Sequence, residues 1–306
     1  MSFTRQNVEF SANDGVILRG WLYQPVQNNT HQQIYPAIIM THGYSAVKEL
    51  YLDLYAELFT KSNFVVLVYD HRNFGESDGD PRQEIDPWKQ IEDYSSAIDY
   101  LQSLTTLVDS LRIGIWGTSY SGGHVLVVSA KDKRVKCVVS QVPTISGKRN
   151  IRRRVKDEDQ WQKLVKDFEK ENENRTTGHK PKVVPIIKPE EQQDWWYFFN
   201  VDQVPDKDKW RCRNWLNEQT LRSIELYSGY EPEEYIEKIS PCPLQMIVGD
   251  KDTVTFTDDQ IEVFQNKARE PKKLVMFNGG HFSPYVEQFD IAANAANEWF
   301  IKYLQN

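Results

Sequence analysis

A serine between small residues follows an apolar run in the middle of the chain. The run ends at Trp116, and Gly117-Thr118-Ser119-Tyr120-Ser121 comes directly after it. Where a strand turns sharply into a helix, the turn can expose a serine nucleophile, and small residues two positions before and after it let the neighbouring backbone approach. The pattern therefore predicts that Ser119 attacks a substrate, with Gly117 and Ser121 at the two flanking positions.

The second flanking position holds serine where glycine is more usual, so the sequence offers two candidate nucleophiles. Ser119 directly follows the predicted strand and has Gly117 at the required offset, which favours it over Ser121. A plain glycine-rich turn without chemistry is the alternative interpretation. The apolar strand before the turn and the helical pattern after it favour the nucleophile elbow.

Candidate partners for this serine follow two apolar runs near the end of the chain. Asp250 and Asp252 come after the first run, and Asp252 lies three residues past Gly249. His281 comes after the second run and two glycines. A histidine can remove the serine proton, and an acid can orient the histidine and stabilise its charged form. The chain order and the strand-end positions predict a triad of Ser119, Asp252 and His281. Asp250 is the alternative acid.

A third loop is a candidate for stabilising negative charge. Thr41-His42-Gly43-Tyr44 follows the first buried apolar run. Charge on the substrate oxygen grows only in the transition state, and two fixed N–H donors stabilise it there. We expect the backbone N–H groups of Tyr44 and Tyr120 to form this oxyanion hole. His42 itself is expected to be structural, with its ring hydrogen-bonded inside the loop.

Apolar runs that alternate with helical patterns must position these residues. Two antiparallel strands are expected first, at 7–10 and 16–23. The later runs are mostly apolar, and 37–40 is wholly so, as is typical of strands buried on both faces of a parallel sheet. They lie at 37–40, 64–70, 111–116, 135–139, 244–248 and 273–277, with helices at 50–59, 88–104, 258–268 and 290–304. The alternation predicts an α/β fold, with a mostly parallel central sheet flanked by helices.

The alternation stops in the middle of the chain and resumes later. Residues 144–236 lack a buried strand pattern, and they are charged, rich in tryptophan and helical in character. We therefore divide the chain into an α/β core, 1–143 and 237–306, and a helical cap insertion, 144–236.

Two runs inside the insertion have distinct compositions. The aromatic run 195–199 supplies Trp195, Trp196 and Phe198 as candidates for an apolar substrate pocket. Such aromatics can instead anchor a cap to its core, or form the contact of a homodimer. The basic run 148–154 precedes the acidic residues 157–159, and this predicts a solvated helix face with internal ion pairs.

The overall composition excludes several classes of partner. A net charge of −7 repels phosphate backbones, so we expect no nucleic-acid partner. No run is long enough to cross a bilayer, and no apolar leader follows Met1, so we expect no membrane role. The three cysteines, Cys137, Cys212 and Cys242, and the histidines lack the spacing of disulfide frameworks or metal sites. We expect no metal, no cofactor and a cytoplasmic location.

Together these motifs resemble those of α/β-hydrolases. The resemblance rests on the His42-Gly43-Tyr44 loop, the segment 70–77, the run 117–123 and Gly280-His281-Phe282, and it covers nearly the whole chain. The nearest branch is that of the X-prolyl dipeptidyl-peptidase-like hydrolases, in a sub-branch that includes fungal polyketide transferases and uncharacterised bacterial proteins. The resemblance implies a triad hydrolase, and in this sub-branch a Ser-x-Ser-Gly-Gly pattern is usual.

Three classes of function follow from these residues. The first is a carboxylesterase-type hydrolase that cleaves an ester, thioester or amide of a small molecule through an acyl-enzyme. The second is an acyltransferase or thioesterase of a biosynthetic pathway, in which the same acyl-enzyme passes its acyl group to an alcohol or amine. The third is a non-catalytic binding protein on a hydrolase scaffold, which would not need all three triad residues.

Overall fold

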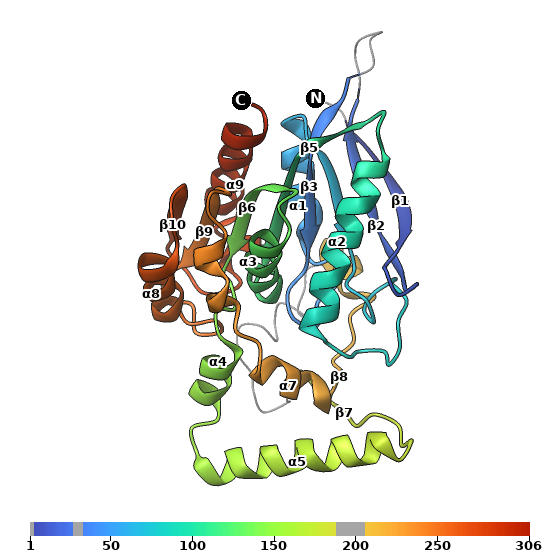
Figure 1. Ribbon diagram of the computed structural model, residues 1–306, viewed down its shortest axis with the longest axis vertical. Helices are drawn as coiled ribbons and strands as arrows, with labels where there is room; N and C mark the ends of the chain where they lie inside the picture. Colours follow the sequence, from blue (N-terminus) through green and yellow to red (C-terminus); the bar gives the residue numbers. More distant parts are fainter. Residues whose placement is uncertain (1–2, 27–32, 188–205) are drawn as a thin grey trace.

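An eight-stranded sheet forms the centre of the computed structural model, which describes residues 3–26, 33–187 and 206–306. The strand order is β1-β2-β4-β3-β5-β6-β9-β10 (Figure 1). β2 pairs antiparallel with β1 and β4, and every other neighbouring pair is parallel. The predicted α/β fold with a mostly parallel sheet is confirmed. The strands are β1 (Phe3–Ser11), β2 (Ile17–Pro25), β3 (Tyr35–Thr41), β4 (Val65–Tyr69), β5 (Val108–Thr118), β6 (Val135–Gln141), β9 (Leu244–Gly249) and β10 (Lys272–Phe277).

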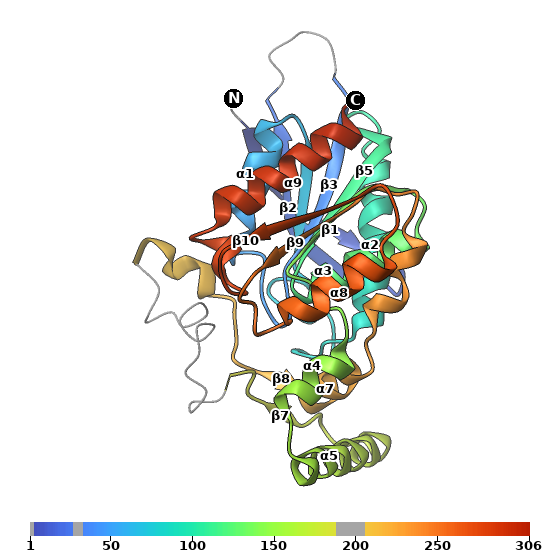
Figure 2. The ribbon, with the colours of Figure 1, turned by 90° about the vertical axis from the view of Figure 1, so that its left-hand side faces the viewer.

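Helices cover both faces of the sheet, as Figure 2 shows. α1 (Leu52–Lys61) and α9 (Phe289–Leu304) pack on one face. α2 (Pro87–Ser103), α3 (Tyr120–Lys131) and α8 (Thr257–Lys267) pack on the other. Two apolar clusters result, one on each side of the sheet, and together they form the core.

The start of α2 shows how local sequence sets these helices. The Asp86 side chain accepts hydrogen bonds from the first free N–H groups, and Pro87 occupies the first turn. Ile91, Ile98 and Leu101 then recur at helical spacing and are buried against the sheet. The predicted helix at 88–104 is confirmed by these contacts.

The parallel register gathers the ends of five strands at one edge of the sheet. Thr41 of β3 is level with Gly117 of β5, and Thr118 is level with Gln141 of β6. Gly249 of β9 is likewise level with Phe277 of β10. Because the chain leaves each of these strands at the same edge, the loops that carry the candidate residues meet there.

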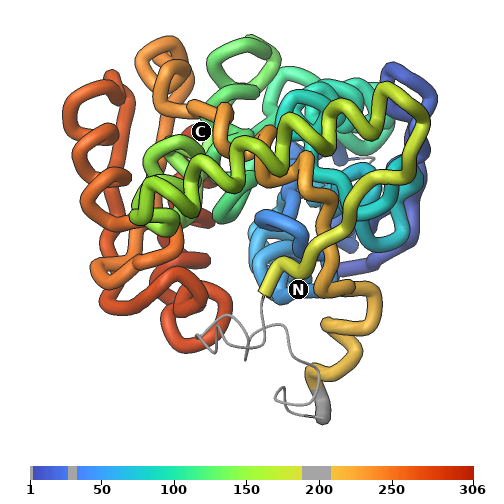
Figure 3. Tube along the Cα trace, turned by 90° about the horizontal axis from the view of Figure 1, so that it is seen from below, coloured from blue at the N-terminus to red at the C-terminus, as the bar shows by residue number. Residues whose placement is uncertain are grey.

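The segment between β6 and β9 lies beyond this edge. It contains α4 (Gly147–Arg154), α5 (Glu158–Thr176) and α7 (Leu221–Ser228), and α5 crosses the end of the core (Figure 3). Two short strands, β7 (Val183–Val184) and β8 (Gln219–Thr220), pair with each other. The 3₁₀ helices are η1 (Asp206–Cys212), η2 (Pro232–Glu234) and η3 (Ile236–Lys238), with η4 (Ser283–Tyr285) in the core.

The basic run forms α4, and its ion pairs reach further than predicted. Arg152 pairs with Glu158 at 2.7 Å, inside the segment. Arg149 and Arg153 instead pair with Asp259 of α8, at 3.0 and 2.9 Å. These bridges therefore fasten α4 to the core. Of the helices in the described ranges, none combines the length and apolar character needed to span a bilayer.

Candidate active site

Ser119 lies on a strained turn between β5 and α3. Its backbone angles are φ 58° and ψ −115°, which are unusual for a residue with a side chain. A Cβ added to Gly117 would lie 2.1 Å from the carbonyl oxygen of Ser121, so glycine is needed at that position. Ser119 is partly exposed. This turn has the geometry of a nucleophile elbow.

Ser119, His281 and Asp252 form a continuous chain of hydrogen bonds. The distance from Ser119 Oγ to His281 Nε2 is 2.9 Å. The distance from His281 Nδ1 to Asp252 Oδ2 is 2.8 Å. His281 and Asp252 are each only 4% exposed, so both are shielded from water. The structure thus brings together the three residues of the predicted triad.

The loop before α8 holds Asp252 in its ionised form. The N–H groups of Val254 and Thr255 donate to Oδ1 at 2.8 and 2.9 Å. The Thr255 hydroxyl and the Gln260 side chain donate to Oδ2 at 2.7 and 3.3 Å. Burial by itself would raise the pKa of Asp252, but the charge of His281 and the hydrogen bonds from His281 and Thr255 outweigh it. The pKa therefore lies well below its ordinary value.

The alternative acid and the alternative nucleophile have other partners. Asp250 is exposed and accepts a hydrogen bond from the N–H of Gly279 at 2.8 Å. Ser121 is fully buried, and its hydroxyl donates to the carbonyl of His42 at 2.5 Å. The contacts with His281 come instead from Asp252 and Ser119.

The His42-Gly43-Tyr44 loop lies directly against the candidate nucleophile. A Cβ added to Gly43 would lie 2.8 Å from the Cβ of Ser119. Within residues 33–187 and 206–306, the N–H groups of Tyr44 and Tyr120 donate to no other group of the chain. Both donors are thus available beside Ser119, as an oxyanion hole requires. The His42 ring bonds to the carbonyl of Gly43 inside the loop, as predicted.

Aromatic rings and an apolar cluster border this region, and the sequence analysis had not singled out Tyr227 or the members of the cluster. Tyr44 packs edge-to-face on Tyr120 and on Tyr227 of α7. Phe282 packs edge-to-face on His281, with ring centroids 5.1 Å apart. The cluster contacting Phe282 comprises Ala46, Val47, Leu50, Ile186, Ile187, Cys212 and Trp215. Its only sequence signal was the adjacency of Phe282 to His281.

The predicted pocket residues Trp195, Trp196 and Phe198 lie outside the described residues. That prediction therefore stays a prediction. The side chains from the insertion that the structure places near the triad loops include Ile186, Ile187, Cys212, Trp215 and Tyr227.

The sequence profile of X-Pro dipeptidyl-peptidase (S15 family) matches residues 14–283. The chain belongs to the S15 family. The family assignment confirms the resemblance that the motifs predicted.

Relatives of this S15-family chain include enzymes of fungal origin. It is 32% identical to a thiohydrolase of Eupenicillium brefeldianum over 283 residues, which cover 90% of this chain and 87% of the relative. It is 29% identical to polyketide transferase grgF of a Penicillium species over 280 residues, which cover 90% and 89%. The crystal structure of the α/β hydrolase GrgF from Penicillium sp. sh18 superposes with a TM-score of 0.82 at 26% identity, covering 99% of this chain and all of that one.

An ionic cluster of the S15-family chain, buried except at Glu76, lies next to the His42-Gly43-Tyr44 loop. Carboxylate oxygens of Glu49, Asp70 and Glu76 lie within 4.8 Å of one another. The Lys48 ammonium group lies among them, at 3.2, 2.7 and 2.7 Å respectively. Burial by itself would lower the pKa of Lys48, but Asp70 and Glu49 raise it above its ordinary value. Lys48 therefore supplies the positive charge that these carboxylates require.

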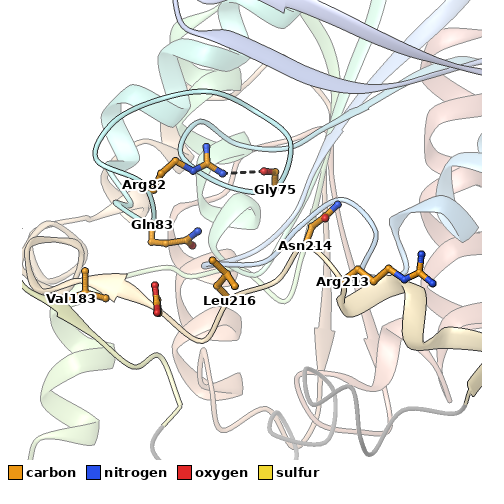
Figure 4. Close-up of a pocket in the computed structure, with 8 residues that line it drawn as sticks. Gly75, Arg82, Gln83, Val183, Arg213, Asn214 and Leu216 are labelled. Carbon is orange, nitrogen blue, oxygen red and sulfur yellow. Dashed lines mark hydrogen bonds between the residues drawn. The ribbon is translucent and has the colours of Figure 1, made fainter.

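A cavity of about 430 Å³ lies between the 75–83 loop and the insertion (Figure 4). Arg82 reaches back across the loop and donates to the carbonyl of Gly75 at 3.0 Å. The lining residues are Gly75, Arg82, Gln83, Val183, Arg213, Asn214, Leu216 and Glu218. None of these is a triad residue, so this cavity is separate from the candidate site.

Proposed function

We propose that this S15-family chain is a serine hydrolase that cleaves an ester, thioester or amide through an acyl-enzyme on Ser119, with carboxylesterase-type activity. The observation that carries the proposal is the hydrogen-bonded chain from Ser119 through His281 to Asp252, with distances of 2.9 and 2.8 Å. Membership of a hydrolase family supports an enzymatic role.

The geometry supports a two-step reaction. His281 Nε2 takes the proton of Ser119 as Oγ bonds to the substrate carbonyl carbon, and His281 then protonates the leaving group. Water, deprotonated by the same nitrogen, attacks the acyl carbon. The bond from that carbon to Ser119 Oγ then breaks as His281 returns the proton to Oγ, and the acid is released. Asp252 keeps the hydrogen of His281 on Nδ1 and stabilises the imidazolium that forms.

Two backbone N–H groups complete the proposed machinery. Those of Tyr44 and Tyr120 would bind the oxyanion of each tetrahedral intermediate, since both are free of other partners within the described ranges and flank Ser119. One such donor typically contributes roughly 3 kcal/mol to lowering the barrier.

The remaining predictions concern the setting of this site. We propose that residues 144–236 form a cap, because α4, α5 and α7 lie beyond the strand ends where the triad sits. The cysteines Cys137, Cys212 and Cys242 are free thiols, which supports the predicted cytoplasmic location. Dimerisation through the aromatic run 195–199 stays a prediction.

Turnover of matched substrates tests the proposal. We expect the wild-type protein to hydrolyse p-nitrophenyl butyrate, and Ser119→Ala to reduce kcat by at least about 10⁴-fold. Ser121→Ala serves as the comparison for the alternative nucleophile and should retain measurable turnover. A Ser119→Ala protein with wild-type turnover would rule out the proposed nucleophile.

Acyl transfer or thioester hydrolysis in a biosynthetic pathway is the second candidate, and named relatives favour each. A polyketide transferase and a thiohydrolase of similar length each cover about nine-tenths of this chain. We would give the enzyme a butyryl thioester together with excess alcohol and measure ester and acid by chromatography. Ester formation above the non-enzymatic rate would support transfer, whereas acid alone would support hydrolysis.

A further inference from the structure

The Ser121 hydroxyl links two segments that meet at the candidate site. It donates to the carbonyl oxygen of His42 at 2.5 Å, and it lies 2.7 Å from Nε2 of His71. A serine hydroxyl has one hydrogen, and here the His42 carbonyl accepts it. His71 must therefore be the donor in the second bond, with its hydrogen on Nε2. Ser121 thus joins α3 to the His42-Gly43-Tyr44 loop, called the oxyanion loop below, and to the loop after β4.

The His42 ring fixes the direction of the Tyr44 N–H group. His42 Nδ1 lies 3.0 Å from the carbonyl oxygen of Gly43, which also accepts from the N–H of Ala46 at 3.3 Å. A trans peptide is planar, so its C=O and N–H groups point in opposite directions. Because the Gly43 carbonyl is held on one side, the Tyr44 N–H must point to the other.

The His42 ring is itself held from two sides. Its Nε2 accepts the backbone N–H of His71 at 3.1 Å, so the ring hydrogen lies on Nδ1 and is donated to Gly43. The rings of His42 and His71 pack edge-to-face, with centroids 4.7 Å apart. Burial lowers the pKa of His42 to about 4, which keeps this arrangement unchanged near neutral pH.

We propose that Ser121 is a positioning residue for the oxyanion hole. The two proposed donors belong to different segments, Tyr44 to the loop and Tyr120 to α3. They can hold one oxygen only if the two segments keep a fixed separation. The Ser121 hydroxyl sets that separation through the His42 carbonyl. Glycine, the more usual residue at this position, has no group that could make this link. The inference rests on the proposed function.

The test compares Ser121→Ala with a matched buried serine. Ser140 of β6 is also fully buried, and its hydroxyl donates to the carbonyl of Gly122 in α3 at 2.8 Å. Ser140→Ala therefore removes the same kind of bond beside the same helix without touching the oxyanion loop. Ser121→Cys keeps the shape of the side chain with a somewhat larger atom and a weak donor, and it replaces Ser121→Ala if the latter does not fold.

We expect Ser121→Ala to lower kcat for p-nitrophenyl butyrate about 10- to 100-fold with KM nearly unchanged, because donor alignment matters mainly in the transition state. Affinity for butylboronic acid, which mimics the tetrahedral intermediate, should fall by a similar factor. Ser121→Cys should recover part of both losses. Ser140→Ala should lower Tm but keep kcat and boronic acid affinity.

Two results would overturn the inference while leaving the proposed function intact. One is a folded Ser121→Ala protein with wild-type kcat and boronic acid affinity. The other is an equal loss of kcat in Ser121→Ala and Ser140→Ala. A folded wild-type protein without ester or thioester turnover would instead overturn the proposed function, and this inference with it.

Discussion

At the scale of single residues, Asp250 and Asp252 are close in sequence but lie in different environments. Asp252 is buried and accepts hydrogen bonds from two backbone N–H groups, a threonine and a glutamine as well as His281. Asp250 is exposed and holds the backbone of Gly279. An acid that orients a histidine needs a fixed side chain in a shielded place, and only the first environment supplies it.

Asp252→Asn should therefore lower kcat by about 10⁴-fold, because the amide favours the wrong tautomer of His281. Asp250→Asn is the matched control, since it makes the same chemical change two residues away. It should change kcat by less than about threefold. Steady-state kinetics on one ester checks both variants, and a larger effect at Asp250 would contradict the assignment of the acid.

The buried His124 should make the free energy of unfolding depend on pH. It is fully buried between Tyr230 and Gln90, at 2.8 and 3.0 Å, and burial lowers its pKa from 6.5 to about 3. Between these values the unfolded chain binds more protons than the folded chain, so acidification favours unfolding. From pH 7 to pH 5 this group should remove about 2 kcal/mol of unfolding free energy.

The contribution of His124 is measured as a difference, because other groups also titrate in this range. Denaturant unfolding of the wild type and of His124→Gln at pH 7 and pH 5 gives the two changes in free energy. The wild type should lose about 2 kcal/mol more than the variant on acidification. Equal losses would show that His124 is not held neutral in the folded protein.

At the scale of elements, the sequence predicted the strands and helices of the core well, for a physical reason. Strands buried on both faces need mostly apolar runs, and such runs mark β3, β4, β5, β6 and β9 in the sequence. The position of each candidate residue just after a run then followed from the parallel topology. The triad contacts could be predicted because all three loops leave the same edge of the sheet.

Other features of the structure could not be predicted, because no local sequence pattern indicates them. The Lys48 cluster joins Glu49 to Asp70 and Glu76, which are distant in sequence. The role of Ser121 depends on the loop that approaches it, and the serine by itself looked like a departure from the motif. In the insertion, β7 and β8 have two residues each and pair with each other, and strands and 3₁₀ helices this short show no periodic pattern in the sequence.

A single methyl group added to the His42-Gly43-Tyr44 loop should shift the whole loop and lower kcat. Gly43→Ala would place a Cβ 2.8 Å from the Cβ of Ser119, so the loop must move away from the elbow. We expect at least about a 100-fold loss of kcat, comparable to the loss of one oxyanion donor, with a folded protein by circular dichroism.

Gly229 provides the control for this substitution. A Cβ added there would lie 4.0 Å from its nearest neighbour, and the backbone is not in the left-handed region. Gly229→Ala should therefore keep wild-type kcat. Wild-type kcat in Gly43→Ala would show that the loop does not abut the reacting serine.

At the scale of the whole molecule, the insertion is fastened to the core by charge as well as by apolar contacts. Arg211 of η1 pairs with Asp53 of α1 and donates to the carbonyl of Glu49 at 3.1 Å. Arg211 and Asp53 are both buried. α4 makes a second attachment through Asp259 of α8. These contacts hold the insertion over the strand ends that carry the triad.

Arg211→Ala should reduce the unfolding free energy by about 3–5 kcal/mol, because it leaves Asp53 buried without its partner. The exposed pair Arg269–Glu237 is the comparison, and Arg269→Ala should change the free energy by less than about 1 kcal/mol. Denaturant titration checks both. Similar values for the two variants would mean that the Arg211 contact does not secure the insertion.

Labelling with a fluorophosphonate tests whether Ser119 is a nucleophile activated by His281. The intact protein is labelled and its peptides are analysed by mass spectrometry, and the same reaction is run on Ser119→Ala and His281→Ala. We expect one adduct, on Ser119, that is absent in the first variant and forms much more slowly in the second. A folded wild-type protein that stays unlabelled, or an adduct on Ser121, would contradict this role of Ser119.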